Sequence, residues 1–347
     1  MMRRDNGTVN LIELIICTLI MAALCFLTRD AFWAAPVLAM PLIYIFARQG
    51  YVAGAGITVA FAAIELAMYG GNAGYTLVCT LPVVITVGIM LKMRIRILYT
   101  AAAGVAALFV SAAALTIYIK LTTGYDAAQY IAINMTASAE TSDEMAAASS
   151  WIAALTQLVN GDMSADSFLK IFSNVEAVRD YALQPATEKL LETYFTAMLP
   201  MAVSTVSVYG GLLDMVIPRA AAKKRGADMM SIPSFDMFIL PRKYSKYIII
   251  SFILGMIPSV AEIDRLVVAG NILFYAAGAI FTVQGLSFIY FLLHRKIKMR
   301  WLCVLILVVI YVVCALIGFD ALLWLGMFEQ LFRIRESMSI FGGGAGK

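Results

Sequence analysis

The sequence predicts an all-α protein: a polytopic transmembrane helical bundle of about nine spans, with a helical insert outside the membrane. Hydrophobic residues make up 62% of the chain and charged residues only 14%, whereas soluble domains have about 45–50% apolar and about 25% charged residues. The apolar residues gather in runs of roughly 20, the length of a helix that crosses a bilayer. No run alternates with the period of a barrel strand, so helices remain the way to satisfy the backbone in lipid.

Five apolar runs fill residues 1–119 and form a predicted N-terminal five-span half. The first follows two Arg residues and has no small-residue cleavage site, so we expect a retained helix rather than a removed signal peptide. The fifth opens with Ala-Ala-Ala-Gly-Val-Ala-Ala, small residues that allow two helices to approach closely. The expected spans are 9–27, 31–47, 51–69, 75–91 and 97–119.

An acidic, hydrophilic segment over residues 120–189 separates the two membrane halves, and alternation of the spans places it outside the cell. Thr141 followed by Glu144 is a capping-box pattern, and Gly161 would end the helix that begins there. A second helix over 164–183 would carry an apolar face that needs a surface to cover. We expect the two helices to pack on each other, either as a lid on the spans or as a solvated spacer.

Residues 190–347 form a predicted C-terminal membrane half. Pro185 suits the first turn of a helix that continues into its first span. The last apolar segment, 321–332, has about 12 residues and is too short to cross, so it could lie in the interface, re-enter or merge with the span before it. The side of the C-terminus therefore stays open. The expected spans of this half are 190–216, 247–260, 266–293 and 301–319.

A basic loop over residues 217–246 orients the chain. Seven of its residues are Lys or Arg, and short loops this basic resist translocation, so we expect the loop and the N-terminus in the cytoplasm. Its first half suits anionic lipid headgroups or a protein partner. Its Pro-bounded, apolar second half is predicted to form a short interfacial helix, where a docking partner would bind. The candidate lipid or partner contacts are Lys223, Lys224, Arg225, Phe235 and Phe238.

Three acidic residues inside the spans are candidate sites, because an intramembrane charge is costly and usually functional. Glu13 lies about one turn into the first span and can snorkel to cytoplasmic water. Asp214 lies just before Pro218 and Arg219, which favours an ion pair at the interface over a ligand site. Glu65 lies deepest, beneath the insert, and either binds a ligand or proton or is a buried acid bonded to a neighbouring helix.

The sequence argues against enzyme and metal chemistry. The single histidine, His294, stands among Lys and Arg, so it belongs to no ligand cluster and no triad. The five cysteines lie in apolar runs without a CxxC. The ending Gly-Gly-Gly-Ala-Gly-Lys lacks the Ser or Thr of a phosphate loop. We therefore expect no catalytic activity, no cofactor and no metal. No nucleic acid is expected either, because the basic residues sit in short loops between spans.

Several local features carry a family resemblance. They are Pro233 with Phe235-Asp236, then Leu240-Pro241-Arg242, Asn271 at the start of a span, and the ending 325–336. Over most of the chain these resemble the YybS-like family of uncharacterised bacterial membrane proteins, which is distantly similar to the S components of energy-coupling-factor transporters. The resemblance implies a multi-pass protein of the bacterial cytoplasmic membrane. It also implies a small-solute-binding or permease-like transport subunit, energised by protein partner subunits. The alternative is a non-transporting scaffold or regulatory membrane protein that binds protein partners.

Overall fold

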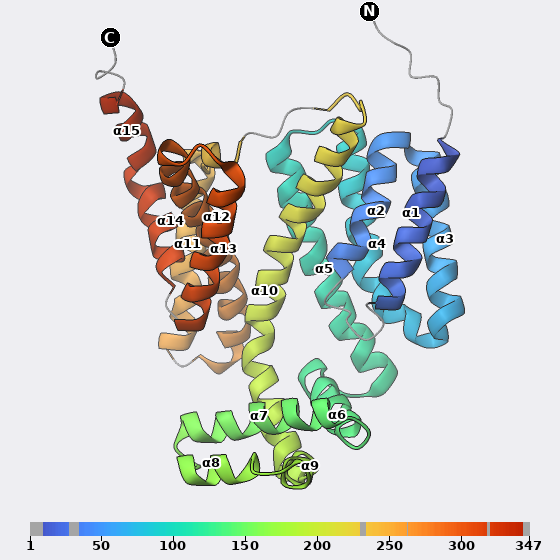
Figure 1. Cartoon of the computed structure of the whole chain (residues 1–347), viewed down its shortest axis with the longest axis vertical. Helices are drawn as coiled ribbons and strands as arrows, with labels where there is room; N and C mark the ends of the chain where they lie inside the picture. Colours follow the sequence, from blue (N-terminus) through green and yellow to red (C-terminus); the bar gives the residue numbers. More distant parts are fainter. Residues whose placement is uncertain (1–9, 28–34, 230–233, 262, 318–319, 343–347) are drawn as a thin grey trace, which may run out of the picture.

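The computed structural model describes residues 10–27, 35–229, 234–261, 263–317 and 320–342, and the regular structure within these ranges is helical. Figure 1 shows an N-terminal bundle, a C-terminal bundle, the long helix α10 between them, and a helical insert at one end. Within the described ranges, four stretches are long and apolar enough to cross a membrane, and others are shorter apolar helices. The nine predicted spans therefore stay a prediction. The four stretches are Tyr51–Lys92, Ile97–Thr123, Pro185–Lys224 and Leu266–Lys296.

The N-terminal bundle follows the predicted spans to within a few residues. The stretch Tyr51–Lys92 is a helical hairpin, because it turns back at the short 3-10 helix η2 (Gly70–Asn72). Gly70 has a φ of 55° there, a left-handed conformation that glycine adopts without a steric penalty. The helices are α1 (Leu11–Leu27), α2 (Ala35–Gln49), α3 (Tyr51–Tyr69), α4 (Ala73–Lys92) and α5 (Ile97–Thr123).

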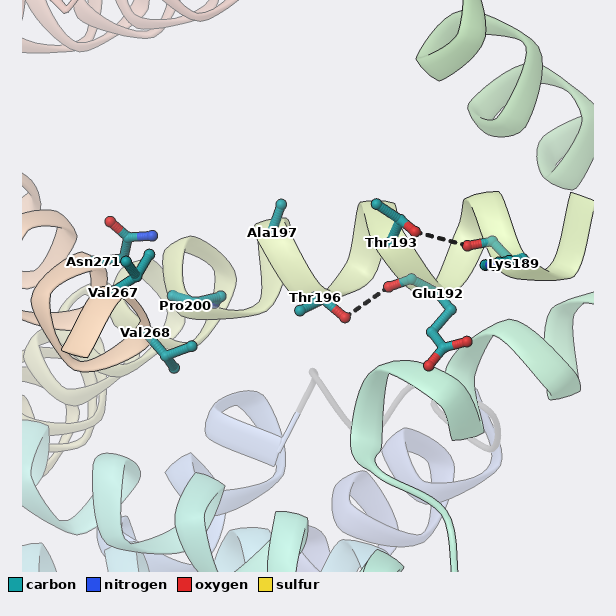
Figure 2. A pocket seen from close by; sticks show the side chains of 9 residues that line it. All are labelled: Lys189, Glu192, Thr193, Thr196, Ala197, Pro200, Val267, Val268 and Asn271. Carbon is teal, nitrogen blue, oxygen red and sulfur yellow. Dashed lines mark hydrogen bonds between the residues drawn. The ribbon is translucent and has the colours of Figure 1, made fainter. Parts of the chain in front are cut away.

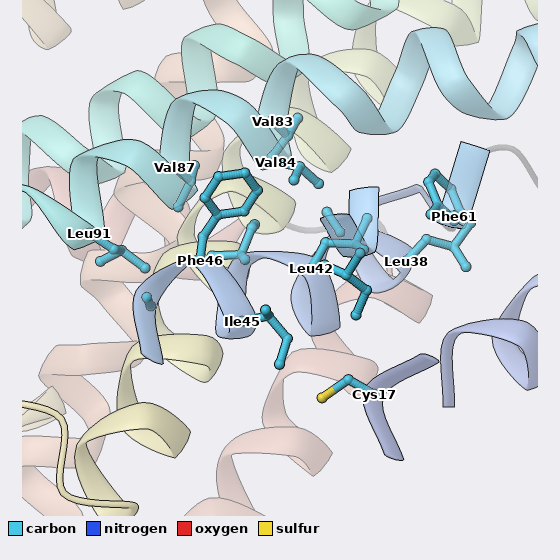
Figure 3. Packing of buried hydrophobic residues seen from close by; sticks show 14 of the residues in the cluster. Cys17, Leu38, Leu42, Ile45, Phe46, Phe61, Val83, Val84, Val87 and Leu91 are labelled. Carbon is cyan, nitrogen blue, oxygen red and sulfur yellow. The ribbon is translucent and has the colours of Figure 1, made fainter. Parts of the chain in front are cut away.

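An apolar core holds these helices together (Figure 3). Side chains of α2 lie at its centre, and Leu42 and Ile45 are fully buried there. The Phe46 ring of α2 faces Val87 of α4, while Phe61 of α3 closes the core at its other end. Full burial of each such side chain stabilises a packed bundle, here through close packing rather than through removal from water, since lipid is equally apolar.

α10 (Pro185–Lys224) is the longest helix and links the insert to the basic loop. It begins with Pro185 in its first turn, as predicted. Its middle crosses α5 in backbone contact: a Cβ added to Gly211 would lie 2.6 Å from the amide nitrogen of Val105 and 2.8 Å from the carbonyl carbon of Gly104. The small residues at the start of α5 therefore do allow a close helix crossing.

The C-terminal bundle contains the short apolar segment whose position was left open. This segment, α14, runs parallel to the second half of α12: Leu323 faces Gly278, and Gln330 bonds to Gln284. Gly326 lies against the backbone of Phe281, where any side chain would collide. α14 therefore packs within the bundle. The helices are α11 (Arg242–Val260), α12 (Asp264–Lys296), α13 (Arg300–Ile317), α14 (Ala321–Phe332) and α15 (Ile334–Gly342).

The start of α1, the end of α15 and the described part of the basic loop lie at one end of the molecule, and the insert lies at the other (Figure 1). α2, α4, α10 and α12 all end on that first side, as alternation of the spans requires. There Arg94, in the loop after α4, forms an ion pair of 2.8 Å with Asp228 of the basic loop. The C-terminal helix thus lies on the same side as the beginning of α1.

The insert differs from the prediction in its helices. It has α6 (Ala127–Ala139), which was not predicted, followed by α7 (Asp143–Asn160), which ends at Gly161 as expected. Ser142 rather than Thr141 caps α7, because its hydroxyl accepts from the Met145 amide. The predicted single helix over 164–183 is wrong: it is divided into α8 (Ala165–Ile171) and α9 (Val175–Ala182). Asn174 begins the second piece by accepting from the Ala177 amide.

The insert helices pack on one another, as expected. Trp151 of α7 makes edge contacts with Phe168 and Phe172, and the Ser150 hydroxyl donates to the Val178 carbonyl at 2.7 Å. Helices α6 and α7 also pack on the first turns of α10. The insert is therefore a folded unit seated on α10, rather than an open hairpin.

Candidate functional site

Glu13 has structural partners that account for an acidic residue at this position in the first span. It lies in the first turn of α1, where its carboxylate accepts a hydrogen bond from Gln49 Nε2 at 3.3 Å. The Arg48 guanidinium lies 4.0 Å away. Both partners belong to the last turn of α2, so Glu13 joins the ends of α1 and α2 at the side of the basic loop.

Glu65 is buried inside the N-terminal bundle, with 1% of its surface exposed. The Cys25 thiol of α1 lies close to its carboxyl group. Tyr69, one turn further along α3, donates to the Cys25 carbonyl at 2.8 Å. The other carboxyl oxygen, Oε2, has no hydrogen-bond partner among the described residues. Glu65 is thus a buried acid beside a neighbouring helix, and both a bond to that helix and a ligand role stay predictions.

Asp214 is fully buried on α10 and does not make the expected contact. Neither carboxylate oxygen has a hydrogen-bond partner in the described part of the chain. The predicted ion pair with Arg219 is wrong, because the salt bridges formed within the described ranges include none that joins the two. The physical reason is the helix: five residues separate the two side chains, which therefore point in different directions.

The predicted contact residues of the basic loop fall into two groups. Lys223, Lys224 and Arg225 are exposed at the C-terminal end of α10, available to headgroups or a partner. Phe235 and Phe238 instead belong to a segment that docks on α12: the Ser287 hydroxyl donates to both of their carbonyls, at 2.6 and 3.1 Å. The predicted short interfacial helix is reduced to one 3-10 turn, η3 (Phe235–Met237).

A buried polar network, which was not predicted from the sequence, holds this loop segment. Arg335 at the start of α15 is 4% exposed, and its guanidinium forms an ion pair of 2.9 Å with Glu329 of α14. The same guanidinium donates to the Asp236 carbonyl at 2.7 Å and to the Ser287 hydroxyl at 3.0 Å. One side chain therefore connects α14, α12 and the loop.

Neighbouring side chains extend the network. Gln284 of α12 donates to Gln330 of α14 at 2.6 Å, and Gln330 donates to the Leu240 carbonyl at 3.0 Å. Arg333 donates to the same carbonyl at 2.9 Å from a left-handed backbone with φ 50°. The signal that could have revealed the network is Glu329, an acidic residue within an apolar run.

A groove of about 510 Å³ lies between the insert half of α10 and the start of α12 (Figure 2). Charged and hydroxyl side chains of α10 line its outer part, although the hydroxyls of Thr193 and Thr196 donate back to the carbonyls of Lys189 and Glu192. Apolar side chains line the part nearer the bundle, with Asn271 of α12 at the inner end. The lining residues are Lys189, Glu192, Thr193, Thr196, Ala197, Pro200, Val267, Val268 and Asn271.

This groove was not predicted, and none of its lining residues is a predicted site acid. Asn271 was noted only as part of a family resemblance. Lys189 and Glu192 carry no signal in the sequence, because charged residues are ordinary at the outer end of a span. Only the packing of α10 against α12, through the Ser204 hydroxyl that donates to the Ile272 carbonyl at 3.0 Å, places these residues around one space.

Comparison with known proteins identifies a family without a known activity. The family model "Predicted membrane protein (DUF2232)" matches residues 14–328, most of the chain. No match was found among curated proteins or among solved structures. The matched region begins just after Glu13 and ends just before Glu329, so it contains the groove and the helices from α2 to α13, but not the end of α14 or α15. The chain is a multi-pass helical membrane protein surrounded by lipid, and it belongs to the DUF2232 family.

Proposed function

We propose that this protein binds a small solute in the groove between α10 and α12. The observation that carries the proposal is the groove itself, whose volume of about 510 Å³ lies in the range of about 300–1,000 Å³ usual for small-molecule sites. It opens beside the insert, the side predicted to be extracytoplasmic. The proposed site therefore lies against α10, rather than at Glu65.

The lining predicts the chemistry of the solute. Lys189 supplies an ammonium group and Glu192 a carboxylate at the outer end. Asn271 supplies an amide about three turns deeper along the groove, because it lies beside Pro200 rather than beside Lys189. Ala197 and Val268 provide apolar surface between them. A solute with a charged or zwitterionic group, an apolar body and a second polar group matches this order.

The resemblance to YybS-like proteins, and through them to the S components of energy-coupling-factor transporters, supports a solute-binding role. Under this proposal, energy for any transport comes from partner subunits. The scaffold alternative has less support, because Phe235 and Phe238 are held by the chain's own α12. Its remaining support is the exposed cluster Lys223, Lys224 and Arg225.

The test is thermal-shift screening of the purified protein in detergent against vitamins and amphiphilic metabolites. A stabilising ligand is expected to lose its effect in Glu192→Gln and Asn271→Leu. The matched control is Glu188→Gln, one turn earlier on α10 and outside the groove lining, which should respond as the wild type does. A ligand whose effect survives both groove variants but is lost in Glu65→Ala would move the site to Glu65.

A further inference from the structure

We propose that Asp214 is a proton-binding site, and that it carries its proton when α5 and α10 are packed as they are here. Its side chain is 0% exposed, and neither carboxyl oxygen has a hydrogen-bond partner among the described residues. An ionised carboxylate in such surroundings is far less stable than the neutral acid. A bound proton is the smallest change that removes the charge.

Close helix packing beside Asp214 hinders water or a counter-ion from compensating the charge of an ionised carboxylate. Gly211, one turn before Asp214, is in backbone contact with Gly104 and Val105 of α5. Gly210 meets Pro36 of α2, whose Cγ would lie 2.8 Å from an added Cβ. The Asp214 side chain has no exposed surface, so water or a counter-ion can reach the carboxyl group only if the helices packed around it move apart. Proton release and loosening of this packing are therefore linked.

Charged groups near this end of the bundle do not neutralise Asp214. Arg219 of α10 is itself buried and forms no salt bridge with it, and Arg48 of α2 lies 4.0 Å from Glu13 instead. The Tyr99 hydroxyl of α5 contacts Tyr244 at 3.3 Å. Other titratable or charged side chains at this end of the helices packed on α10 are Tyr44, Lys92, Arg96, Tyr290, His294, Arg295 and Lys296. Within the described ranges none of them is a hydrogen-bond partner of Asp214.

The pH dependence of folding stability is set by the number of protons that the folded and unfolded states bind. Under this proposal the folded chain holds the proton, because the carboxyl group is fully buried without a partner, whereas the unfolded chain exposes the group to water and releases the proton. The folded state then binds more protons than the unfolded state, so stability falls as pH rises. Asp214→Asn removes the titration while preserving the shape of the neutral acid, and it should flatten this part of the dependence.

The direct test is infrared spectroscopy of the detergent-solubilised full chain at pH 7, which resolves the C=O stretch of protonated carboxylic acids. We expect a band that is absent in Asp214→Asn and present in Glu65→Gln, the control for the other buried carboxyl group that forms no salt bridge among the described residues. A second measurement is the melting temperature from pH 5 to pH 9, which should fall less in Asp214→Asn than in the wild type. An unchanged band in Asp214→Asn would overturn the proposal. So would failure of Asp214→Asn to fold, because the amide replaces only a neutral acid without loss of shape.

Discussion

Arg335 is the side chain on which the C-terminal polar network depends. Replacing it with Ala removes the ion pair with Glu329 and the donors to Asp236 and Ser287 in one step. It leaves the Glu329 carboxylate, which is 0% exposed, without its cation. The loop segment from Phe235 to Leu240 also loses one of its attachments to α14 and α12.

The expected loss in the free energy of unfolding is about 3–5 kcal/mol, the usual effect of breaking a buried ion pair from one side. The value should lie in the upper part of that range, because the guanidinium also loses hydrogen bonds of 2.7 and 3.0 Å to uncharged groups. The measurement is denaturant unfolding in detergent micelles followed by tryptophan fluorescence. Trp324 of α14 stacks edge-on against Phe252 of α11, so its emission reports the docking of α14.

Two further variants separate this effect from a general loss of charge. Arg242→Ala removes an exposed ion pair to Glu336 of 3.4 Å and should change the free energy of unfolding by less than about 1 kcal/mol. Adding Glu329→Gln to Arg335→Ala should restore part of the loss, because the uncompensated buried charge disappears. A loss in the free energy of unfolding for Arg335→Ala as small as that for Arg242→Ala would contradict this expectation. So would a further loss when Glu329→Gln is added to Arg335→Ala.

Three other changes have defined outcomes. Gly326→Val places a side chain against the Phe281 carbonyl and should cost about 1–3 kcal/mol or more in the same unfolding titration; a neutral result would show that α14 does not lie against α12. Ser142→Ala removes the cap of α7, so amide exchange at Met145 should speed up by the equivalent of about 1 kcal/mol, and unchanged exchange would contradict the capping contact. Glu13→Gln should change stability by less than about 1 kcal/mol, because its contact with Arg48 is long and partly exposed; a large loss would mean that Glu13 does more than join two helix ends.

The hydrophobic pattern predicted most of the membrane helices because it is a local property. The expected span 51–69 coincides with α3, and α14 occupies the predicted 321–332. The break between α8 and α9 was missed because the apolar period continues across it. The Asn174 side chain, which accepts from the Ala177 amide, begins a new helix there. Capping contacts of this kind compete with continuation of the helix. The spacing of the apolar residues gives little sign of them.

The polar network and the groove could not be predicted in the same way, because their members are far apart in the chain. Arg335 meets the carbonyl of Asp236, and Gln284 meets Gln330, only after α12, α14 and the loop have packed together. Asp214 was expected inside a span with an ion pair at the interface, and neither its full burial nor its missing partner was predicted. Whether Asp214 pairs with Arg219 depends on the directions in which these two side chains leave α10.

The central claim is that a solute binds between α10 and α12, and cysteine protection tests it most directly. Val268, half exposed in the groove lining, is replaced by Cys and labelled with a maleimide, with the wild type reporting the background from the native cysteines. A ligand found by thermal-shift screening should slow labelling of Val268→Cys and leave labelling of Val308→Cys, half exposed on α13 outside the groove lining, unchanged. Equal labelling of Val268→Cys with and without saturating ligand would contradict the account.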